Sequence, residues 1–231
     1  MTTITRWLPD FTQAPVVRKA ALAVAGLAVA GGAIAGPAAA ASAAPASADK
    51  STVAVQEQRD SGKRNGGKEL GFTYKFQETY FYCAPAATKM ALSALGKNVS
   101  QDELAKKLRT TEAGTSSALE TTRVLKEVSG KDYRTVEIPG QKASKAETDR
   151  LREDIVRAVD DKRPVVANII GTSTDTDGHG HSYEGGHYIA VVGYRDGGNT
   201  VKIGDSWSDE GQYWISTDKL ANWIASRGYS A

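Results

Sequence analysis

Two hydrophobic periods follow one another along the chain, a helical one first and a strand-like one in the second half. After Cys83, apolar side chains recur at helical spacing through Ala86, Met90 and Leu95, and Gly96 follows. This spacing, ended by a glycine, predicts a helix. Cys83 is therefore expected at or just before a helix N-terminus.

Three further helices are predicted from capping boxes. In each box a Ser is followed three residues later by a Glu, so that the two side chains can bond the free amides of the first turn. The pattern predicts helices at 101–109, 118–129 and 145–161. The pairs are Ser100 with Glu103, Ser117 with Glu120, and Ser144 with Glu147.

Short runs rich in Val, Ile and Tyr replace the helical spacing in the second half of the chain. Gly and Asp or Asn residues separate them, and Asp196-Gly-Gly-Asn199 is typical of a hairpin turn. A last helix is expected at 218–226. Helices followed by strands indicate an α+β fold. The predicted strands are 165–170, 187–194, 200–205 and 212–216.

The first 48 residues have the pattern of a secretory signal peptide. Arg18-Lys19 precedes an apolar run at 20–35, and small residues and prolines follow. The run is about 16 residues long, shorter than the roughly 20 needed to span a bilayer. We expect export by the general secretory route, because no Arg pair precedes the run, with cleavage at 40–48. No stable membrane association is expected afterwards, and the mature protein is expected to be extracellular.

Residues 49–69 are polar and lack apolar periodicity, so they predict a leader or linker ahead of a domain at 70–231. The chain has 29 basic and 27 acidic residues. Three basic residues and one acidic residue lie in the first 48, which leaves 26 of each. Balanced charge without a Lys/Arg cluster gives no footprint for nucleic acid or an anionic membrane. We expect neither as a partner.

The chain has one cysteine, Cys83. Exported proteins usually pair their cysteines as disulfides, so a single thiol in such a chain is unwanted, intermolecular or a nucleophile. A helix N-terminus favours the thiolate, because its dipole and free amides stabilise negative charge. The position of Cys83 therefore indicates a nucleophile.

A thiol nucleophile needs a base and a group that orients the base. His179 and His181 lie in a Gly-, Ser- and Asp-rich segment that we expect to be a mobile loop, whereas His187 opens a strand. A strand holds a side chain more firmly, so His187 is the better base. If this strand pairs with the next through the turn at 197–198, Asp205 lies beside His187 and can accept its hydrogen bond.

These segments together resemble the C39-like peptidase family, which has a papain-like fold. In that family a Gln six positions before the Cys contributes to the oxyanion hole, and Gln77 stands there. Gly186-His187, leading into an apolar strand that ends in Gly-Tyr, is similar to the second block of the family. Asp205 takes the place of the Asp in the third block. Ala84 departs from the pattern, since the family usually has Gly after the Cys.

The resemblance implies a cysteine peptidase that acts on a peptide or protein substrate without a cofactor. Together with the signal-peptide pattern it predicts a secreted peptidase, which we expect to be a monomer. Cys83 is then the nucleophile, His187 the acid and base, and Asp205 its orienting group. Gln77 and the Cys83 amide would form the oxyanion hole. Trp207 resembles the Trp of the Asn-Ser-Trp segment in papain-type enzymes, and could shield the His187–Asp205 bond or contact substrate. A non-catalytic binding module, and an amidase or transpeptidase acting on cell-wall peptide, stay open as alternatives.

The segment 173–184 offers a competing, metal-based chemistry. It matches four positions of a calcium-loop frame, but a Ser replaces the first acidic ligand, and strands rather than helices flank it. A zinc site lacks a fourth ligand fixed by spacing. We therefore expect a flexible loop on the substrate side and no metal. The residues concerned are Ser173, Asp175, Asp177, Gly178 and Glu184 for calcium, and His179 and His181 with Asp175 or Asp177 for zinc.

Overall fold

The computed structural model describes residues 66–231 of the chain. The predicted signal peptide at 1–48 lies outside the described residues, and so does most of the segment 49–69, so both stay predictions. Strand β1 (Lys68–Glu69) pairs with β4 and lies directly before the predicted domain start. Within residues 66–231, no helix combines the length and apolar character that crossing a membrane requires.

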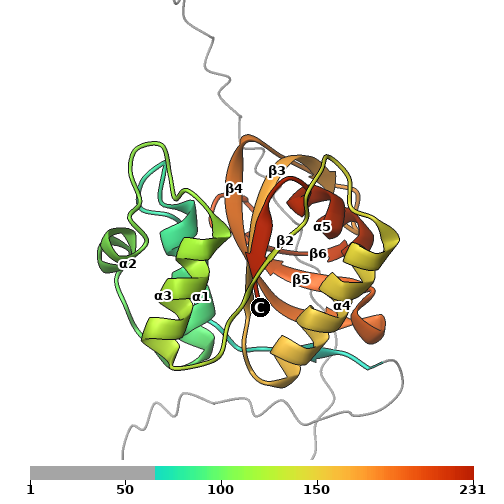
Figure 1. Ribbon diagram of the computed structural model, residues 1–231, viewed down its shortest axis with the longest axis horizontal. Helices are drawn as coiled ribbons and strands as arrows, with labels where there is room; N and C mark the ends of the chain where they lie inside the picture. The colour runs from blue at the N-terminus through green and yellow to red at the C-terminus, as the bar shows by residue number, and fades with distance from the viewer. Residues whose placement is uncertain (1–65) are drawn as a thin grey trace, which may run out of the picture. The chain divides into compact units, whose positions relative to one another are not determined.

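Helices cover both faces of a central sheet (Figure 1). Helices α1, α2 and α3 lie on one face, and α4 and α5 lie on the other. The predicted helices are all present, with ends that differ by a few residues at most. Their bounds are α1 (Cys83–Ala94), α2 (Gln101–Lys107), α3 (Ala118–Ser129), α4 (Lys145–Asp160) and α5 (Thr217–Ile224).

The strands form one sheet in the order β2-β7-β3-β4-β5-β6. Strand β1 pairs with β4 beyond the end of β3, on the edge of β4 opposite to β5. All the pairings are antiparallel. The α+β prediction is therefore confirmed, although the sequence did not reveal β1, β2 or β7. The remaining strands are β2 (Thr135–Glu137), β3 (Val165–Thr174), β4 (Gly180–Arg195), β5 (Thr200–Gly204), β6 (Gln212–Ser216) and β7 (Gly228–Ser230).

Two of the three predicted capping boxes form as expected. At Ser100 and at Ser144 the hydroxyl accepts the amide of the N3 residue, and the N3 Glu bonds back to the Ser amide. Helix α3 has the predicted bounds, but among the described residues Ser117 makes no side-chain cap bond. Glu120 instead forms an ion pair with Arg123. The start of α3 was therefore predicted correctly, although the capping box used to predict it does not form.

The segment 173–184 is an ordered hairpin, so the prediction of a flexible loop is wrong. Thr174 pairs with Gly180, and the pairing of β3 with β4 continues from there into the sheet. The register shifts between Ile169 and Gly171, where Gly171 has a φ of 82°. This β-bulge interrupts the alternation of side chains, and the interruption hides the continuous strand in the sequence.

Alternate residues of the central strands face two separate cores. Val165 and Ala167 pack with α4 and α5, whereas Val166 and Tyr188 pack with α1 and α3. This alternation follows from the two-residue period of a strand. It holds α1 against β4, the strand that carries His187.

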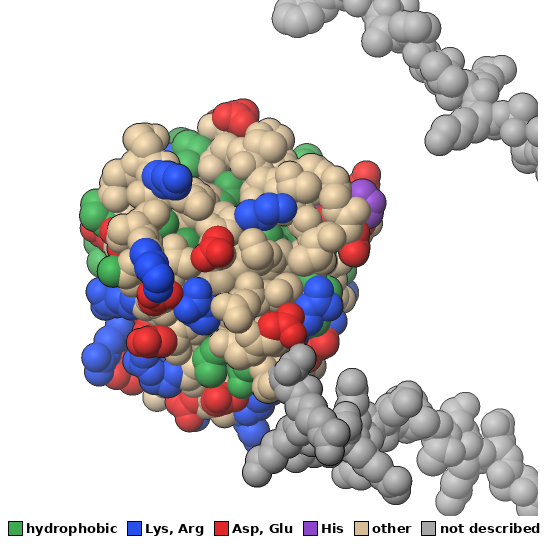
Figure 2. All heavy atoms as spheres, turned by 90° about the vertical axis from the view of Figure 1, so that its right-hand side faces the viewer, with side chains coloured by type: hydrophobic (Ala, Val, Ile, Leu, Met, Phe, Trp, Pro, Cys, Tyr) green, Lys and Arg blue, Asp and Glu red, His purple; other side chains and the backbone are tan. Residues whose placement is uncertain are grey.

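Acidic and basic side chains are interspersed on the face shown in Figure 2, which looks at the side of Figure 1 where α4 lies. Along α4, Asp149 pairs with Lys145 and Arg152, and Asp154 pairs with Arg157. Ion pairs at helical spacing on a protein surface contribute little to stability. They balance the charge of this surface more than they stabilise the fold.

Candidate active site

Helix α1 positions the thiol. Cys83 is its first residue and is half-buried. Pro85 lies in the first turn, where a missing N–H breaks no helical hydrogen bond. Ala84 is fully buried and packs with Ala87 among the side chains of the α1–α3 core. The residue that departs from the family pattern therefore packs into this core. Cys83 lies at the positive end of a rigid helix, where negative charge is stabilised.

Strands β4 and β5 bring His187 and Asp205 together. Their register places Gly204 opposite Ala190, and Asp205 follows directly after the end of β5. The Nε2 atom of His187 lies 2.7 Å from Oδ1 of Asp205, and both side chains are buried. The contact that the predicted hairpin required is present.

The Asp205 carboxylate is saturated with hydrogen bonds. Oδ1 faces His187 and accepts the Trp207 amide at 3.1 Å, and Oδ2 accepts the hydroxyls of Tyr183 and Tyr213, each at 2.8 Å. Burial raises the pKa of this carboxyl, but these hydrogen bonds and the positive charge of His187 outweigh burial and hold the pKa below its ordinary value. Asp205 is therefore an ionised group with a fixed orientation.

His187 is held in its charged form. Burial lowers its pKa, but hydrogen bonds to Asp205 and Cys83, together with the charges of these two groups, raise the pKa to about 9. The difference from the ordinary value of about 6.5 corresponds to roughly 3 kcal/mol in favour of the imidazolium. Since Nε2 faces Asp205, Nδ1 is the ring nitrogen left for the thiol.

Tyr183 is the aromatic ring that covers His187, and it was not among the residues predicted for the site. The two rings stack with centroids 4.0 Å apart and an interplanar angle of 21°. Tyr183 also stacks on Trp223, 5.8 Å away, on the side of the α5 core. Trp207, in contrast, has 55% of its surface exposed and reaches Asp205 through its backbone amide. Tyr183 stands four residues before His187, a spacing that would have flagged it if the strand had been recognised.

Gln77 is buried and its side-chain amide is fixed from both ends. Oε1 accepts the Ser206 hydroxyl at 3.1 Å, and Nε2 donates to the Thr79 carbonyl at 2.8 Å. The Gln77 backbone amide also donates to the Ser206 carbonyl, at 3.3 Å. These bonds join the segment before Cys83 to the segment after Asp205. One hydrogen of Nε2 is used by Thr79, and the other is left for a ligand.

The residues considered for zinc lie together at the turn of the β3–β4 hairpin. Asp175 and His181 are buried there, and His179 lies beside them; Asp177 donates its backbone amide to Asp175. Glu210, from the segment between β5 and β6, joins them, and it could not be identified from spacing along the sequence.

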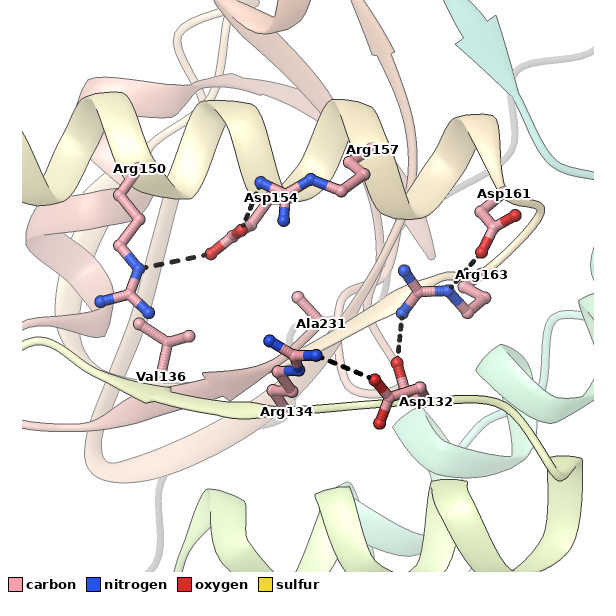
Figure 3. Close-up of a pocket in the computed structure, with 9 residues that line it drawn as sticks. All are labelled: Asp132, Arg134, Val136, Arg150, Asp154, Arg157, Asp161, Arg163 and Ala231. Atoms are coloured by element: carbon pink, nitrogen blue, oxygen red, sulfur yellow. Dashed lines mark hydrogen bonds and ion pairs between the residues drawn. The ribbon is translucent and has the colours of Figure 1, made fainter.

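A hollow of about 330 Å³ lies between α4 and β2 and contains none of the candidate site residues (Figure 3). Charged side chains line it, and they pair with one another. Arg157 lies 3.0 Å from Asp154, and Arg163 lies 3.1 Å from Asp161. These ion pairs neutralise the arginine charges that an anionic ligand would need. The lining residues are Asp132, Arg134, Val136, Arg150, Asp154, Arg157, Asp161, Arg163 and Ala231.

A sequence model of the Peptidase C39-like family matches residues 69–231 of the chain. A search of curated proteins finds no match. The family match, together with helices on both faces of an antiparallel sheet, confirms the predicted papain-like α+β fold.

Several solved structures are similar to this chain at low sequence identity. One from Bacillus anthracis, designated a C39-like peptidase, is 14% identical, with a TM-score of 0.49 over 71% of this chain and 96% of that chain. The peptidase domain of Streptococcus ComA, a bifunctional ABC transporter, is 17% identical, with a TM-score of 0.47 over 69% and 96%. Xylellain, a cysteine protease from Xylella fastidiosa, is 13% identical, with a TM-score of 0.47 over 71% and 84%.

Proposed function

Because the chain belongs to the Peptidase C39-like family, we propose that it is a cysteine peptidase with Cys83 as its nucleophile. The observation that carries this proposal is the state of His187. Its ring is bonded to Asp205 at 2.7 Å, and its contacts with Asp205 and Cys83 raise its pKa to about 9. An imidazolium beside a thiol stabilises the thiolate, which is the reactive form.

In the first half of the proposed reaction, the Cys83 sulfur attacks the carbonyl carbon of the scissile peptide bond. A C–S bond forms and the carbonyl π electrons move to the oxygen. The free Nε2 hydrogen of Gln77 and the Cys83 amide donate to this oxyanion. When the oxyanion collapses, the C–N bond breaks and His187 gives its Nδ1 proton to the leaving amine. The products are a thioester on Cys83 and a neutral His187.

In the second half, neutral His187 accepts a proton from water as the water oxygen attacks the thioester carbon. The C–S bond breaks, the acid product leaves, and the thiolate and imidazolium are restored. Asp205 stays ionised throughout and orients the ring. Its four hydrogen bonds stabilise the ionised carboxylate and hold it in place.

Trp207 is proposed to contact the substrate. Its exposed ring borders a hollow of about 380 Å³ that Tyr183 and His179 also line. Because Tyr183 stacks on His187, this hollow adjoins the proposed catalytic groups. An exposed aromatic ring at such a place offers an apolar surface for a substrate side chain.

We further propose that the protein is exported and that the segment 1–48 is removed. The apolar run at 20–35, with its basic flank and small residues, supports this. N-terminal sequencing of protein recovered from the culture medium is expected to place the first residue just after a cleavage site at 40–48. Protein that keeps Met1, or that stays inside the cell, would contradict the proposal.

The test of the catalytic proposal is the alkylation rate of Cys83 against pH, measured with iodoacetamide on the full chain. An isolated thiol with an ordinary pKa of about 8.5 keeps about 1% thiolate at pH 6.5. We expect the wild type to react much faster than this at pH 6.5, and His187→Ala to lose the excess. His179→Ala serves as the control and is expected to react like the wild type. Equal rates for all three proteins would overturn the proposal.

Turnover is measured separately, because a non-catalytic binding module could keep the same ion pair. The full chain is incubated with a mixture of defined peptides, and new termini are read by mass spectrometry. We expect cleavage by the wild type and none by Cys83→Ala. Fast alkylation without cleavage of any peptide would favour the binding module.

A further inference from the structure

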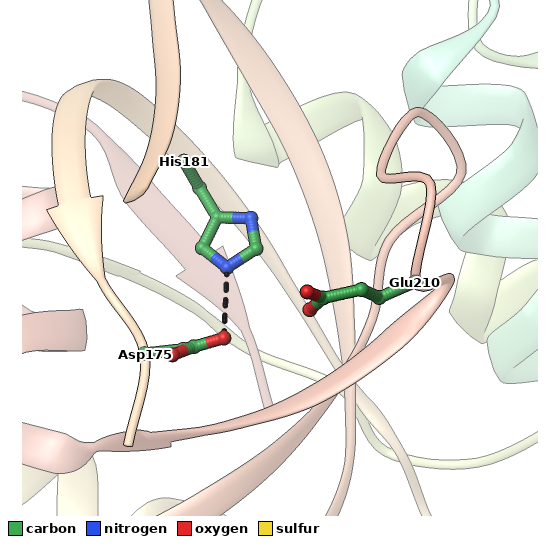
Figure 4. Close-up of side chains that lie close together, drawn as sticks. All are labelled: Asp175, His181 and Glu210. Atoms are coloured by element: carbon green, nitrogen blue, oxygen red, sulfur yellow. Dashed lines mark hydrogen bonds and ion pairs between the residues drawn. The ribbon is translucent and has the colours of Figure 1, made fainter. Parts of the chain in front are cut away.

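Four metal-ligating side chains converge at the tip of the β3–β4 hairpin. Asp175, His179 and His181 belong to the hairpin, and Glu210 comes from the segment between β5 and β6. The ligand atoms of Asp175, His181 and Glu210 all lie within 4.8 Å of one another. Figure 4 shows the Glu210 carboxylate turned toward the other two side chains from a separate part of the chain. The exposed His179 lies 2.8 Å from Glu210 and 3.4 Å from Asp175.

The contacts of Asp175 with the two imidazoles have the spacing of ligands that share a cation, whereas the contact of His179 with Glu210, at 2.8 Å, has the length of a hydrogen bond. Oδ2 of Asp175 lies 3.3 Å from Nε2 of His181 and 3.4 Å from Nδ1 of His179. Charge-assisted hydrogen bonds are usually about 2.7–2.9 Å long, and His187 with Asp205 meets that range at 2.7 Å. Ligand atoms about 2.0–2.1 Å from a tetrahedral zinc ion lie roughly 3.3–3.4 Å apart.

The two oxygens of Asp175 have separate tasks. Oδ1 accepts the backbone amides of Asp177 and His179, both at 2.9 Å, and so closes the hairpin turn. Oδ2 faces the two imidazoles instead. The Asp175 side chain has no exposed surface and that of His181 only 6%. A carboxylate that is buried with one oxygen aimed at imidazole nitrogens is costly unless positive charge compensates it.

We propose that Asp175, His181 and Glu210, with His179 as the fourth ligand, bind a divalent transition-metal ion of the zinc class. Two imidazoles and two carboxylates suit zinc, whereas calcium prefers oxygen ligands alone. The ligand set therefore favours zinc over the calcium loop considered from the sequence. Glu210 is the additional zinc ligand that could not be identified from the spacing of residues along the hairpin.

A neighbouring aromatic ring holds one ligand of the proposed metal site in place. The His181 ring stacks on Tyr213, with centroids 3.9 Å apart and an interplanar angle of 16°. This stacking fixes the plane of the imidazole, and contacts that orient ligands in this way tune metal binding. His179, His181 and Glu210 also line the hollow of about 380 Å³ beside Trp207, which gives an ion access from solvent.

A bound ion would join two segments that otherwise meet through side chains alone. It would tie the hairpin tip to the segment between Gly204 and Gln212, which carries Asp205 and Trp207. The site lies outside the proposed catalytic groups, so we assign the metal a structural task. The inference does not depend on the proposed peptidase activity.

The test is calorimetric titration of the full chain with zinc chloride, without a polyhistidine tag. The protein carries Cys83→Ala, so that the thiol cannot act as a zinc ligand. We expect one zinc ion per chain. In this background His181→Ala and Glu210→Gln are each expected to weaken binding by about tenfold or more. Glu184→Gln, which changes another carboxylate of the same hairpin, is the matched control and should bind like its parent.

Cobalt(II) gives a second measurement that distinguishes this site from surface binding. A tetrahedral site with two imidazoles should give intense visible d–d absorption, and Glu210→Gln should reduce it. Because Glu210 is exposed, this variant is expected to fold even if His181→Ala does not. The proposal is overturned if zinc does not bind stoichiometrically, or if Glu210→Gln and Glu184→Gln bind zinc equally well.

Discussion

Replacing Asp205 by Asn tests whether the charge of this residue, rather than its shape, sets the state of His187. An Asn keeps the planar side chain and can still accept from His187 and from the Trp207 amide. Its new amide hydrogens meet the Tyr183 and Tyr213 hydroxyls, which can rotate and accept them. We therefore expect Asp205→Asn to fold, and to lose mainly the negative charge.

The size of the effect follows from the pKa of His187. Its rise from an ordinary value of about 6.5 to about 9 is worth roughly 3 kcal/mol, shared between Asp205 and Cys83. Asp205 contributes more to this rise than Cys83 does, both through its hydrogen bond and through its charge. Losing that share should weaken proton binding by His187 at least about tenfold, or about 1.4 kcal/mol.

The assay is the pH dependence of kcat/KM for a cleaved peptide, whose alkaline limb reports loss of the His187 proton in the free enzyme. We expect this limb near pH 9 in the wild type, and at least about one pH unit lower in Asp205→Asn. Asp209→Asn changes an exposed carboxylate nearby and should leave the limb in place. An unchanged limb in a folded Asp205→Asn protein would refute the electrostatic argument.

Three further predictions address the groups around this pair. Gln77→Ala should lower kcat/KM by about 10²–10³ while the alkylation rate of Cys83 stays unchanged, as expected for an oxyanion donor; an equal fall in both would exclude that role. Tyr183→Phe keeps the stacked ring but removes one bond to Asp205, so urea unfolding should show a loss of about 1 kcal/mol, and Tyr183→Ala should lose clearly more. Because the folded chain raises the pKa of His187 from about 6.5 to about 9, this residue adds stability that is complete below pH 6.5 and is lost as pH rises through 9. The free energy of unfolding, measured with urea, should therefore fall more between pH 6 and pH 10 for the wild type than for His187→Gln. An equal fall in both proteins would contradict this prediction.

The elements that the sequence predicted well are those with signals within a few residues. The capping boxes at Ser100 and Ser144 act across one helical turn, and both are formed. The turn at 196–199 joins the two strands that lead to His187 and Asp205, so pairing through it brings the two side chains close together. Local rules sufficed because each contact depended on one turn of known geometry.

The parts that the sequence did not reveal depend on contacts between distant segments. Strand β7 is short and pairs with β2, which lies far earlier in the chain. Tyr213 and Ser206 gain their partners only when β5 and β6 are in register and the segment around Gln77 packs on them. The extra residues 184–186 of β4, which face a single residue of β3, interrupt the strand pattern that would have identified Tyr183. No local pattern encodes such contacts, because they are fixed by tertiary register.

One ring connects the proposed metal site with the proposed catalytic pair. Tyr213 stacks on His181 at 3.9 Å and donates its hydroxyl to Asp205 at 2.8 Å. A metal ion that fixed His181 would restrict Tyr213, and through it one of the four hydrogen bonds that orient Asp205. The other three come from His187, Tyr183 and a backbone amide, and they do not pass through the hairpin tip. Loss of the metal should therefore lower the temperature at which activity is lost, while activity at moderate temperature persists.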